Sequence, residues 1–567
     1  MDGIVFSYLD KLVTDSDKIS DKLTADKWYA MPYKCGDISG RMLFAGELTS
    51  PPEVRLSLGL EGYYKIFIGT VNMKSMNLFN LKLGSDESFD AMTSPTMESL
   101  HAWTRPEYFE EFLWRCEKLT EEDIVFRKPY SRHNNACGIA FIRCVPVSEA
   151  EYLQLNAPSG RERIHGHFDE DTNAEDMFEE KTEVLCRYRQ LTGGDIKEMS
   201  LEFSFDYDTE NEDHTNLLVS DRLWQKGDAA FSSVRESAYR KRVDYLHSHG
   251  ISVYAMNRMS VATFTAPYSN SYWSRRNFVN EHPELYCRTR LGEEIKVCSY
   301  AYPEVRRYVI DRFVDMMQYG FDGVSLILHR GMHIGFEEPV ISEFARRYPD
   351  VDPHTLPVTD SRLHDVFCYF MTEFMKELRT ALKPFCGGKA KINVITDYTP
   401  DTSKHFGLDV AEWAREGLCD SVMQGIMEVY EDLDGTLDEE GRIDLAKYAE
   451  KIKQSPIIKR YHNTSLERAL EGSIAYRKAL EGTDVAYYAA LPWSHRVGYS
   501  EIEPYKQALR QAGFNSFLAW NTNHTLLDVA EMHAVMGRGE EYYTVKRYRT
   551  LSLDGSNMSE FNPNWRG

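Results

Sequence analysis

The chain has 567 residues. This is longer than a chain that folds around a single hydrophobic core, so we expect two or more domains. Hydrophobic residues make up 42% and charged residues 27%, the balance of an ordinary folded protein. The formal net charge of −22 argues against nucleic acid and anionic membranes as partners, because binding phosphate groups requires an excess of lysine and arginine.

The N-terminal stretch MDGIVFSYLDKLVTDSDK has neither the basic start nor the apolar centre of a signal peptide. No apolar run approaches the ~18 residues of a membrane-spanning helix. The ten cysteines are scattered and form no CxxC pair, which is typical of reduced thiols in the cytoplasm. We therefore expect a cytoplasmic protein without a membrane span.

Residues 1–155 are predicted to form a β-sandwich domain. Short runs of apolar, β-branched and aromatic residues are separated there by Gly, Pro, Asn and Ser, and no long helix intervenes. The segment 105–119 has a mixed periodicity that fits either a helix or an edge strand. The expected strands are 55–60, 63–70, 78–83, 123–127 and 139–147.

From about residue 161 the pattern changes to strand, loop and helix in alternation. Such alternation favours a parallel sheet with crossover helices, and eight repeats favour closure into a (β/α)8 TIM barrel. We assign residues 156–567 to this barrel with a C-terminal extension. The expected strands are 163–168, 199–205, 252–256, 324–328, 391–395, 421–423, 484–489 and 515–519.

A doubly wound sheet is the alternative architecture for the second part of the chain. That fold normally carries a glycine-rich phosphate-binding turn after its first strand. Here the first strand runs into HGHFDED, with neither GxGxxG nor GxxxxGK[ST]. Nucleotide binding is therefore not supported, and no cofactor is predicted.

Polar residues follow most of the expected barrel strands, and active sites of barrels lie at the carboxyl ends of the strands. Histidine, arginine and amide side chains there would bind sugar hydroxyl groups. Tryptophans would stack on a sugar ring, although a core tryptophan that closes the barrel is equally compatible with the pattern. The substrate-binding candidates are His165, His167, Asn257, Arg258, His329, Arg330, Gln424, Trp493, His495, Trp520 and Asn523.

Two carboxyl groups that face one bond can hydrolyse a glycoside. We predict the adjacent pair Glu337 and Glu338 as the acid, because neighbouring carboxylates raise each other's pKa and burial has the same effect. Asp397 or Asp206 would supply the second carboxylate. The alternative is that the glutamates cap the helix beginning at Pro339, since acidic residues are favoured at helix N-termini.

The pair His165 and His167 suggests a second kind of chemistry. Residues two apart on a strand point to one face, so these histidines are placed to bind one metal ion, as in amidohydrolase-type barrels. Such a site also needs a histidine after a later strand and an aspartate after the last one. The fifth and sixth strands offer only Asp397 and Gln424. A metal-dependent hydrolase is thus an alternative, and no metal is predicted.

The order of these features resembles the bacterial family 10-like glycosyl hydrolase proteins. In the first part the resemblance is carried by LSLGLEGYYKIFIG and LKLGSDESF. In the barrel it is carried by RVDYLHSHGISVYAMNRM, CSYAYPEVRRYVIDRFVDMMQYGFDGVSL, FGLDVAEWAREGLCDSVM and GFNSFLAWNTN. The resemblance covers most of the chain and implies a glycosidase-like TIM barrel after an N-terminal β-sandwich.

Arg258 and Arg330 match the arginines that this family carries on its third and fourth strands. Relatives read DGIELDFMR where this chain reads DGVSLILHR, so Ser325 and Ile327 stand where acidic residues are expected. Either one of the two loop glutamates replaces the missing carboxylate, or the hydrolase activity has been lost. A non-catalytic carbohydrate-binding barrel is therefore a third hypothesis.

Together these patterns predict a cytoplasmic glycoside hydrolase that cleaves O-glycosidic bonds of a small oligosaccharide or glycoside. The absence of a secretion signal favours an imported sugar over an intact polymer. The expected partner is this small carbohydrate, with no nucleic acid and no membrane, and a homo-oligomer is compatible with the sequence.

Overall fold

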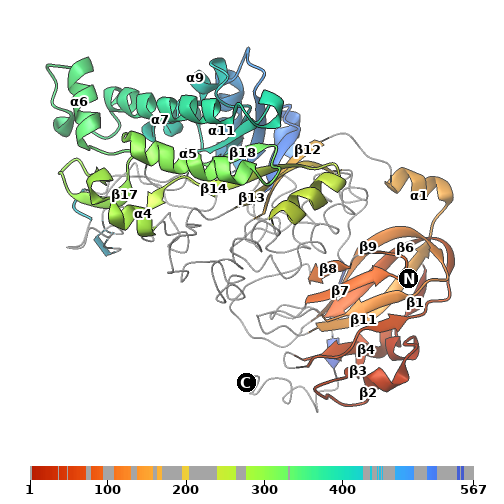
Figure 1. Cartoon of the computed structure of the whole chain (residues 1–567). Coiled ribbons are helices and arrows are strands. Elements are labelled where there is room, and N and C mark those ends of the chain that lie inside the picture. Colours follow the sequence, from red (N-terminus) through yellow and green to blue (C-terminus); the bar gives the residue numbers. More distant parts are fainter. Residues whose placement is uncertain are drawn as a thin grey trace.

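The structure is a computed structural model with two parts, an N-terminal part built of β-sheets and a second part built of a barrel and its helices (Figure 1). The residues that it describes are 3–35, 38–46, 49–71, 78–87, 89–93, 108–128, 137–156, 162–168, 194–202, 239–262, 276–329, 333–425, 434–436, 444, 446–447, 450, 466–490, 507–519, 546–549 and 551–553.

The N-terminal part consists of two mainly antiparallel sheets that share one hydrophobic core, as the predicted sandwich requires. The first sheet runs in the order β2-β3-β4-β11-β6-β9-β23, with β1 beside β11 and β24 beside β3, and the second runs β5-β10-β7-β8. Trp28 and Trp114 from the first sheet and Leu56 and Phe79 from the second lie in the same buried cluster. The strands are β1 Ile4–Phe6, β2 Ile19–Ser20, β3 Trp28–Cys35, β4 Ile38–Ala45, β5 Val54–Leu56, β6 Glu61–Val71, β7 Leu78–Leu83, β8 Asp90–Thr93, β9 Tyr108–Thr120, β10 Ile124–Arg127, β11 Cys137–Pro146, β23 Lys546–Arg549 and β24 Leu551–Leu553.

The segment 105–119, whose periodicity fits either a helix or a strand, forms most of strand β9. It pairs with β6 along the whole length of β6, from Glu61 to Val71, so tertiary pairing decides for a strand. β23 pairs with β9 and β24 with β3. The first sheet therefore contains β23 and β24, although the predicted boundary between residues 155 and 156 assigns these two strands to the second domain.

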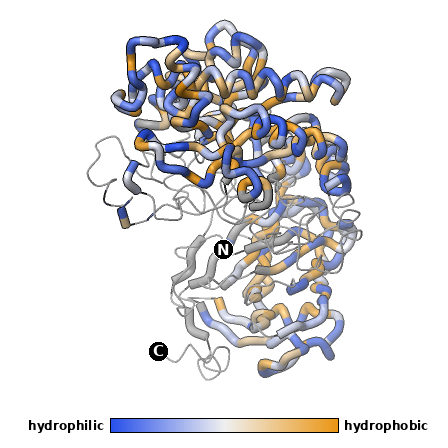
Figure 2. Tube along the Cα trace, turned by 60° about the vertical axis from the view of Figure 1, so that its left-hand side comes forward, coloured by the Kyte–Doolittle hydropathy of each residue, from blue (hydrophilic) through white to orange (hydrophobic). Residues whose placement is uncertain are grey.

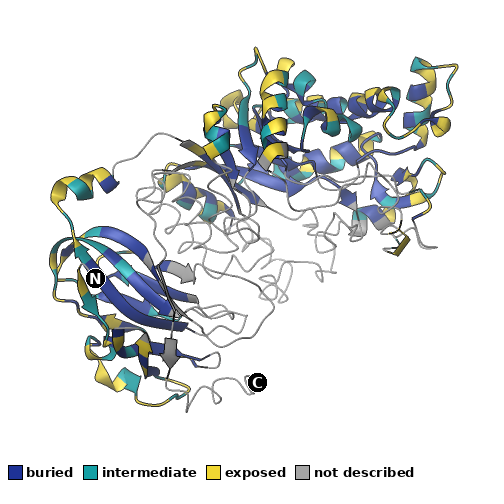
Figure 3. Ribbon diagram, turned by 180° about the vertical axis from the view of Figure 1, so that it is seen from behind, coloured by how far each residue is buried: buried dark blue, intermediate teal, exposed yellow. Residues whose placement is uncertain are grey.

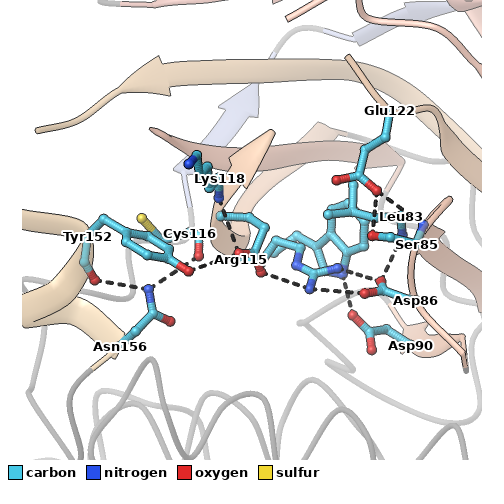
Figure 4. A network of polar contacts seen from close by, with 12 residues as sticks. Leu83, Ser85, Asp86, Asp90, Arg115, Cys116, Lys118, Glu122, Tyr152 and Asn156 are labelled. Carbon is cyan, nitrogen blue, oxygen red and sulfur yellow. Dashed lines mark hydrogen bonds and ion pairs between the residues drawn. The ribbon is translucent and has the colours of Figure 1, made fainter. Parts of the chain in front are cut away.

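An ion-pair network joins the two sheets of the N-terminal part (Figure 4). Arg115 on β9 lies 2.6 Å from Asp86, in the turn between β7 and β8, and 3.0 Å from Glu117. The neighbouring Trp114 donates its indole N–H to Asp90 on β8 at 2.7 Å. The side chains of Trp114 and Arg115 are both buried, so these bonds satisfy polar groups that water cannot reach.

The second part contains a closed barrel of eight strands, so the predicted (β/α)8 fold is confirmed. All neighbouring strands are parallel, and β22 pairs with β12 to close the ring. Each of the eight expected strands overlaps one strand of the barrel. These are β12 Glu162–Phe168, β13 Gly194–Glu202, β14 Ser252–Arg258, β18 Gly323–Ile327, β19 Lys391–Thr396, β20 Ser421–Gln424, β21 Ala486–Ala490 and β22 Ser516–Ala519.

Helices cover the outside of the barrel, where hydrophobic and hydrophilic residues alternate along them (Figure 2) and the strands beneath are mostly buried (Figure 3). The longest, α7 Ser361–Leu382, begins after Asp360, whose side chain accepts the Arg362 N–H. Its buried residues, such as Val366 and Phe374, pack on outward-facing strand residues in one core. Other helices of the second part are α4 Arg276–Glu281, α5 Pro303–Met317, α6 Glu338–Arg347, α8 Pro400–His405, α9 Val410–Arg415 and α11 Leu466–Ala479, and residues 239–248 and 507–511 are also helical. Helix α1 Glu149–Asn156 instead packs on β6 and β9 of the N-terminal part.

A small three-stranded antiparallel sheet is inserted between β14 and α5. Its strands are β15 Val261–Ala262, β16 Tyr286–Arg288 and β17 Glu294–Cys298, in the order β15-β17-β16. It follows the carboxyl end of β14, so it belongs to the loops that surround the site. Among the helices that the structure describes, none combines the length and hydropathy that crossing a membrane requires.

Candidate active site

Four of the predicted site residues lie on the inward face at the carboxyl ends of barrel strands. Strand residues alternate between the two faces, and the outward ones, such as Val324 and Ile392, pack in the core beneath the helices. The opposite parity therefore turns the site residues toward the barrel axis. They are His167 near the end of β12, Arg258 as the last residue of β14, His329 shortly after β18 and Asp397 directly after β19, and all four are buried.

Asp397 and His329 are neighbours at the same level of the barrel. The register pairs Ser325 with Asn393 and Ile327 with Ile395, and the next inward residues of these two segments are His329 and Asp397. Their exposed fractions are 4% for His329 and 2% for Asp397. Removing a carboxyl group and an imidazole from water costs free energy. Buried titratable groups of this kind are candidates for a function.

Gly425, directly after β20, allows His329 to occupy this place. A Cβ atom on Gly425 would lie 3.0 Å from Cγ of His329 and 2.1 Å from the carbonyl oxygen of Thr396. A side chain at position 425 would therefore displace the imidazole or the end of β19. The ends of β18, β19 and β20 thus meet around Asp397.

Below this level a hydrogen-bonded chain crosses the barrel interior. The His165 Nε2 atom lies 2.6 Å from Ser200 Oγ, and the Ser200 hydroxyl donates to Ser325 at 2.7 Å. Asn393 donates its amide to Ser325 at 3.2 Å and accepts from Ser421 at 2.7 Å. Ser325, which replaces an expected acid, is therefore part of a polar core where branched apolar residues are usual.

Glu198 is a buried carboxylate beside His165, at one end of this series of hydrogen bonds. Arg163 donates to it at 2.6 Å and Tyr254 at 3.2 Å, and Tyr488 also donates to it through its hydroxyl group. Burial alone would raise the pKa of Glu198, but the bonds and charges of His165, Tyr488 and Arg163 outweigh it and hold that pKa well below its usual range. Glu198 is therefore ionised and satisfied inside the barrel.

These contacts bear on the metal alternative. His165 uses Nε2 for Ser200, and its Nδ1 atom lies 3.5 Å from Glu198. Burial lowers the pKa of His165, and the hydrogen bond and charge of Glu198 oppose that effect. Across the described ranges, no three His, Cys, Asp or Glu side chains are grouped to hold a metal ion. The predicted ligand pair thus has no third partner in this part of the chain.

Glu337 is fully buried, but its partners lie in the loops and not on a barrel strand. It accepts hydrogen bonds from the Ser299 hydroxyl, from the Gly335 N–H at 3.0 Å and from the Arg288 N–H at 3.3 Å. Burial raises the pKa of Glu337, and these donors oppose that effect. The carboxylate thereby ties the loop after β18 to the sheet inserted after β14.

Glu338 is exposed as the first residue of α6, and its carboxylate accepts from Ser342 at 2.5 Å. The neighbouring Glu337 is the N-terminal cap position of the same helix. The two glutamates therefore turn to different surroundings, one inward to loop donors and the other to solvent. The helix-terminus alternative therefore fits Glu338 in the first turn of α6, whereas the Glu337 side chain makes no capping hydrogen bond to that helix.

Gln424 and Asn257 have the outward parity, away from the barrel axis. The Gln424 amide donates to the carbonyl oxygens of Tyr398 at 3.0 Å and Ala469 at 3.3 Å, and its oxygen accepts from Ser473 at 3.1 Å. Asn257 shares the face of Val253. These positions favour a structural role for both amides, in place of the predicted contact with sugar.

The remaining predicted site residues lie outside the described residues and stay predictions. They are Asp206, Arg330, Trp493, His495, Trp520 and Asn523.

No protein-family model matches the sequence, and no curated protein matches it. Among solved structures, it is similar to an α-galactosidase from Thermus thermophilus in complex with stachyose, with a TM-score of 0.35 and 11% identity over 90% of this chain and 97% of the other. A GH26 β-(1,4)-mannanase from Podospora anserina gives 0.28 and 11%, over 94% and 96%. A maltogenic α-amylase from Thermotoga neapolitana gives 0.33 and 10%, over 67% and 76%. At these values the neighbours carry no argument about substrate or mechanism.

Proposed function

We propose that the chain is a glycoside hydrolase whose active site lies at the carboxyl end of the barrel, with Asp397 as one of its two carboxylates. The observation that carries this proposal is the burial of both Asp397 and His329 just after the paired strands β19 and β18, at the end of the barrel where such enzymes place their reacting groups. The second carboxylate is proposed to be Asp206, which follows β13 in the chain.

In this reaction one carboxyl group protonates the leaving oxygen and the other acts as nucleophile or as base for a water molecule. His167, His329 and Arg258 lie around the same axis, and their N–H groups would bind sugar hydroxyls. The substrate is proposed to be a small oligosaccharide or glycoside, because a site within a barrel mouth surrounds one or a few sugar rings.

The test is hydrolysis of a panel of p-nitrophenyl glycosides by the wild type, Asp397→Asn and Asp206→Asn. Loss of a catalytic carboxylate is expected to lower kcat by about 10²–10⁴-fold for each variant. Asp401→Asn is the matched control, because Asp401 is an exposed residue in the first turn of α8, close in sequence to Asp397. Full activity of Asp397→Asn on every cleaved substrate would refute the proposal.

A non-catalytic carbohydrate-binding barrel is the second candidate, and β18 supplies the observation that favours it. Its inward residues are Ser325, which is bonded in the polar core, and Ile327, which lies opposite Arg258. Neither can act as an acid. This candidate predicts that calorimetry detects binding of a monosaccharide or disaccharide while no glycoside of the panel is cleaved.

A further inference from the structure

The turn that starts at the last residue of β19, residues 396–399, carries Asp397 and is held by the side chains of other elements. Tyr476 on α11 is fully buried, and its hydroxyl donates to the carbonyl oxygen of Asp397 at 2.7 Å. The same hydroxyl lies 2.7 Å from the Thr396 hydroxyl and 2.7 Å from the Ser403 hydroxyl. One phenol group therefore joins the end of β19, the helix α8 and the helix α11.

The chemistry of the phenol sets the direction of these bonds. A tyrosine hydroxyl has one proton, and a carbonyl oxygen can only accept, so the proton lies on the bond to Asp397. The Thr396 hydroxyl then donates to the phenol oxygen, while the Ser403 hydroxyl lies beside that oxygen and donates to the Thr399 carbonyl oxygen at 2.9 Å. Burial raises the pKa of Tyr476 well above its usual range, so the group keeps its proton. The Tyr476 hydroxyl is therefore neutral and hydrogen-bonded to the Asp397 backbone.

A second anchor holds the next residue of the turn. The Gln424 amide donates to the Tyr398 carbonyl oxygen at 3.0 Å. Helix α11 comes close enough to complete this contact because residue 472 is glycine. A Cβ there would lie 2.4 Å from both the Gln424 Nε2 atom and the Tyr398 carbonyl oxygen.

The last residue of the turn is fixed by a capping box at the start of α8. The Thr399 hydroxyl accepts the Thr402 N–H at 3.0 Å, and the Thr402 hydroxyl accepts the Thr399 N–H at 2.9 Å. Bonds to side chains or backbone groups outside the strand therefore fix each residue from Thr396 to Thr399. The backbone that carries the Asp397 carboxylate has little freedom to rotate.

We propose that Tyr476 is a positioning residue, which holds the Asp397 backbone so that its carboxylate keeps the orientation that the reaction needs. The inference rests on the proposed function of Asp397 and adds a residue that touches no substrate. Catalytic groups must be held within a fraction of an ångström, and bonds to the neighbouring backbone supply that rigidity. An anchor of this kind acts on the rate of the chemical step and not on substrate affinity.

The variant Tyr476→Phe removes only the hydroxyl. We expect kcat on the best p-nitrophenyl glycoside to fall by about 10–100-fold with KM unchanged, since small misplacements of a reacting group cost rates of that order. Tyr487→Phe is the matched control. Tyr487 stacks on Tyr476 at 5.6 Å between ring centroids, but its hydroxyl donates to Ser473 at 3.1 Å, where that of Tyr476 donates to the Asp397 backbone. The control should keep the wild-type kcat.

Thr396 offers a second pair of variants that does not open a space in the helix layer. Thr396→Val removes the hydroxyl that donates to the phenol, and Thr396→Ser keeps it. We expect the valine variant to follow Tyr476→Phe in losing kcat and the serine variant to restore the wild-type value. Equal kcat for the valine and serine variants would overturn the inference.

A crystal structure of Tyr476→Phe gives a readout that needs no substrate. The inference expects the Asp397 carboxylate to move or to occupy two orientations, while the Tyr487→Phe structure superimposes on the wild type. An Asp397 that keeps its place in Tyr476→Phe overturns the inference, whatever the activity. Full activity of Asp397→Asn would overturn the proposed function instead, and the position of Asp397 in Tyr476→Phe would still decide the question of anchoring.

Discussion

Glu337 and Asp397 are both buried carboxyl groups that follow barrel strands, but they lie in different surroundings. Glu337 is surrounded by hydrogen-bond donors from two loops, whereas Asp397 is turned to the barrel axis beside His329. A carboxylate that is saturated by fixed N–H and O–H donors serves the structure, because its lone pairs have no room for a substrate.

The variant Glu337→Gln is expected to lower the free energy of unfolding by about 1–3 kcal/mol, because its amide N–H₂ would face donors that need an acceptor. Thermal denaturation measures this change. Glu338→Gln is the control, since Glu338 is exposed and bonded only to Ser342 among the described residues. Equal stability of the two variants would show that the loop contacts of Glu337 contribute nothing.

The site residues differ in how far the sequence could show them. Asp397 and His329 follow apolar strands and His167 lies near the end of one, so the local pattern alone predicts their position at the carboxyl end of the barrel. Glu198 lies one residue before the expected second strand, 199–205. The predicted strand therefore did not include the alternation of Glu198 and Ser200 that marks an inward polar face. Tyr476 leaves no mark in the sequence, because it lies on a helix and its main target is a backbone carbonyl.

The two histidines between helices α7 and α8 form an element-scale feature with a pH dependence. His364 and His405 stack with ring centroids 4.3 Å apart. Burial, with the neighbouring His364, lowers the pKa of His405 from 6.5 to about 4. Between these values the unfolded chain binds a proton that the folded chain does not, so stability falls as the pH falls from 6.5 toward 4.

We therefore expect the melting temperature of the wild type to fall by about 2–4 °C more over this pH range than that of His405→Gln, which has no group to protonate there. Differential scanning calorimetry at a series of pH values measures the difference. His282→Gln, which alters an exposed histidine paired with Glu284, is the control and should follow the wild type. Parallel pH profiles for the wild type and His405→Gln would contradict this account.

Strands β9 and β11 of the sandwich are linked by a buried ion pair. Arg143 donates to Glu111 through two bonds, at 2.8 and 2.6 Å, and both side chains are almost fully buried. Arg143→Met leaves Glu111 buried and is expected to cost roughly 3–5 kcal/mol in urea denaturation. Lys376→Met, which breaks an exposed pair on α7, should cost nothing measurable. A small loss for Arg143→Met would mean that water reaches Glu111.

At the scale of elements, local patterns sufficed for the barrel strands, because each is a short apolar run between turn-forming residues. They did not suffice for β23 and β24, since a short strand such as Leu551–Leu553 is defined by its partner β3 and not by its own residues. The sheet inserted after β14 was missed for the same reason. Its strands are short and carry charged residues such as Arg288 and Glu294.

For the whole molecule, the pairing of β23 and β24 with the first sheet connects the C-terminal segment to the N-terminal part. Deleting residues 546–567 would expose the edges of β9 and β3, and unpaired edges promote association between chains. We expect this truncation to aggregate in size-exclusion chromatography with light scattering. Deleting only residues 554–567 keeps both strands and is the control. A monodisperse longer truncation would show that the two strands are dispensable.

The central claim is that the reacting carboxylate belongs to the barrel end, at Asp397, and not to the loop, at Glu337. The direct measurement is kcat of Asp397→Asn and Glu337→Gln on the same p-nitrophenyl glycoside, with thermal denaturation to confirm that both are folded. The account predicts a loss of at least about 10²-fold for Asp397→Asn and wild-type kcat for Glu337→Gln. The reverse pattern, with activity kept by Asp397→Asn and lost in Glu337→Gln, would contradict it.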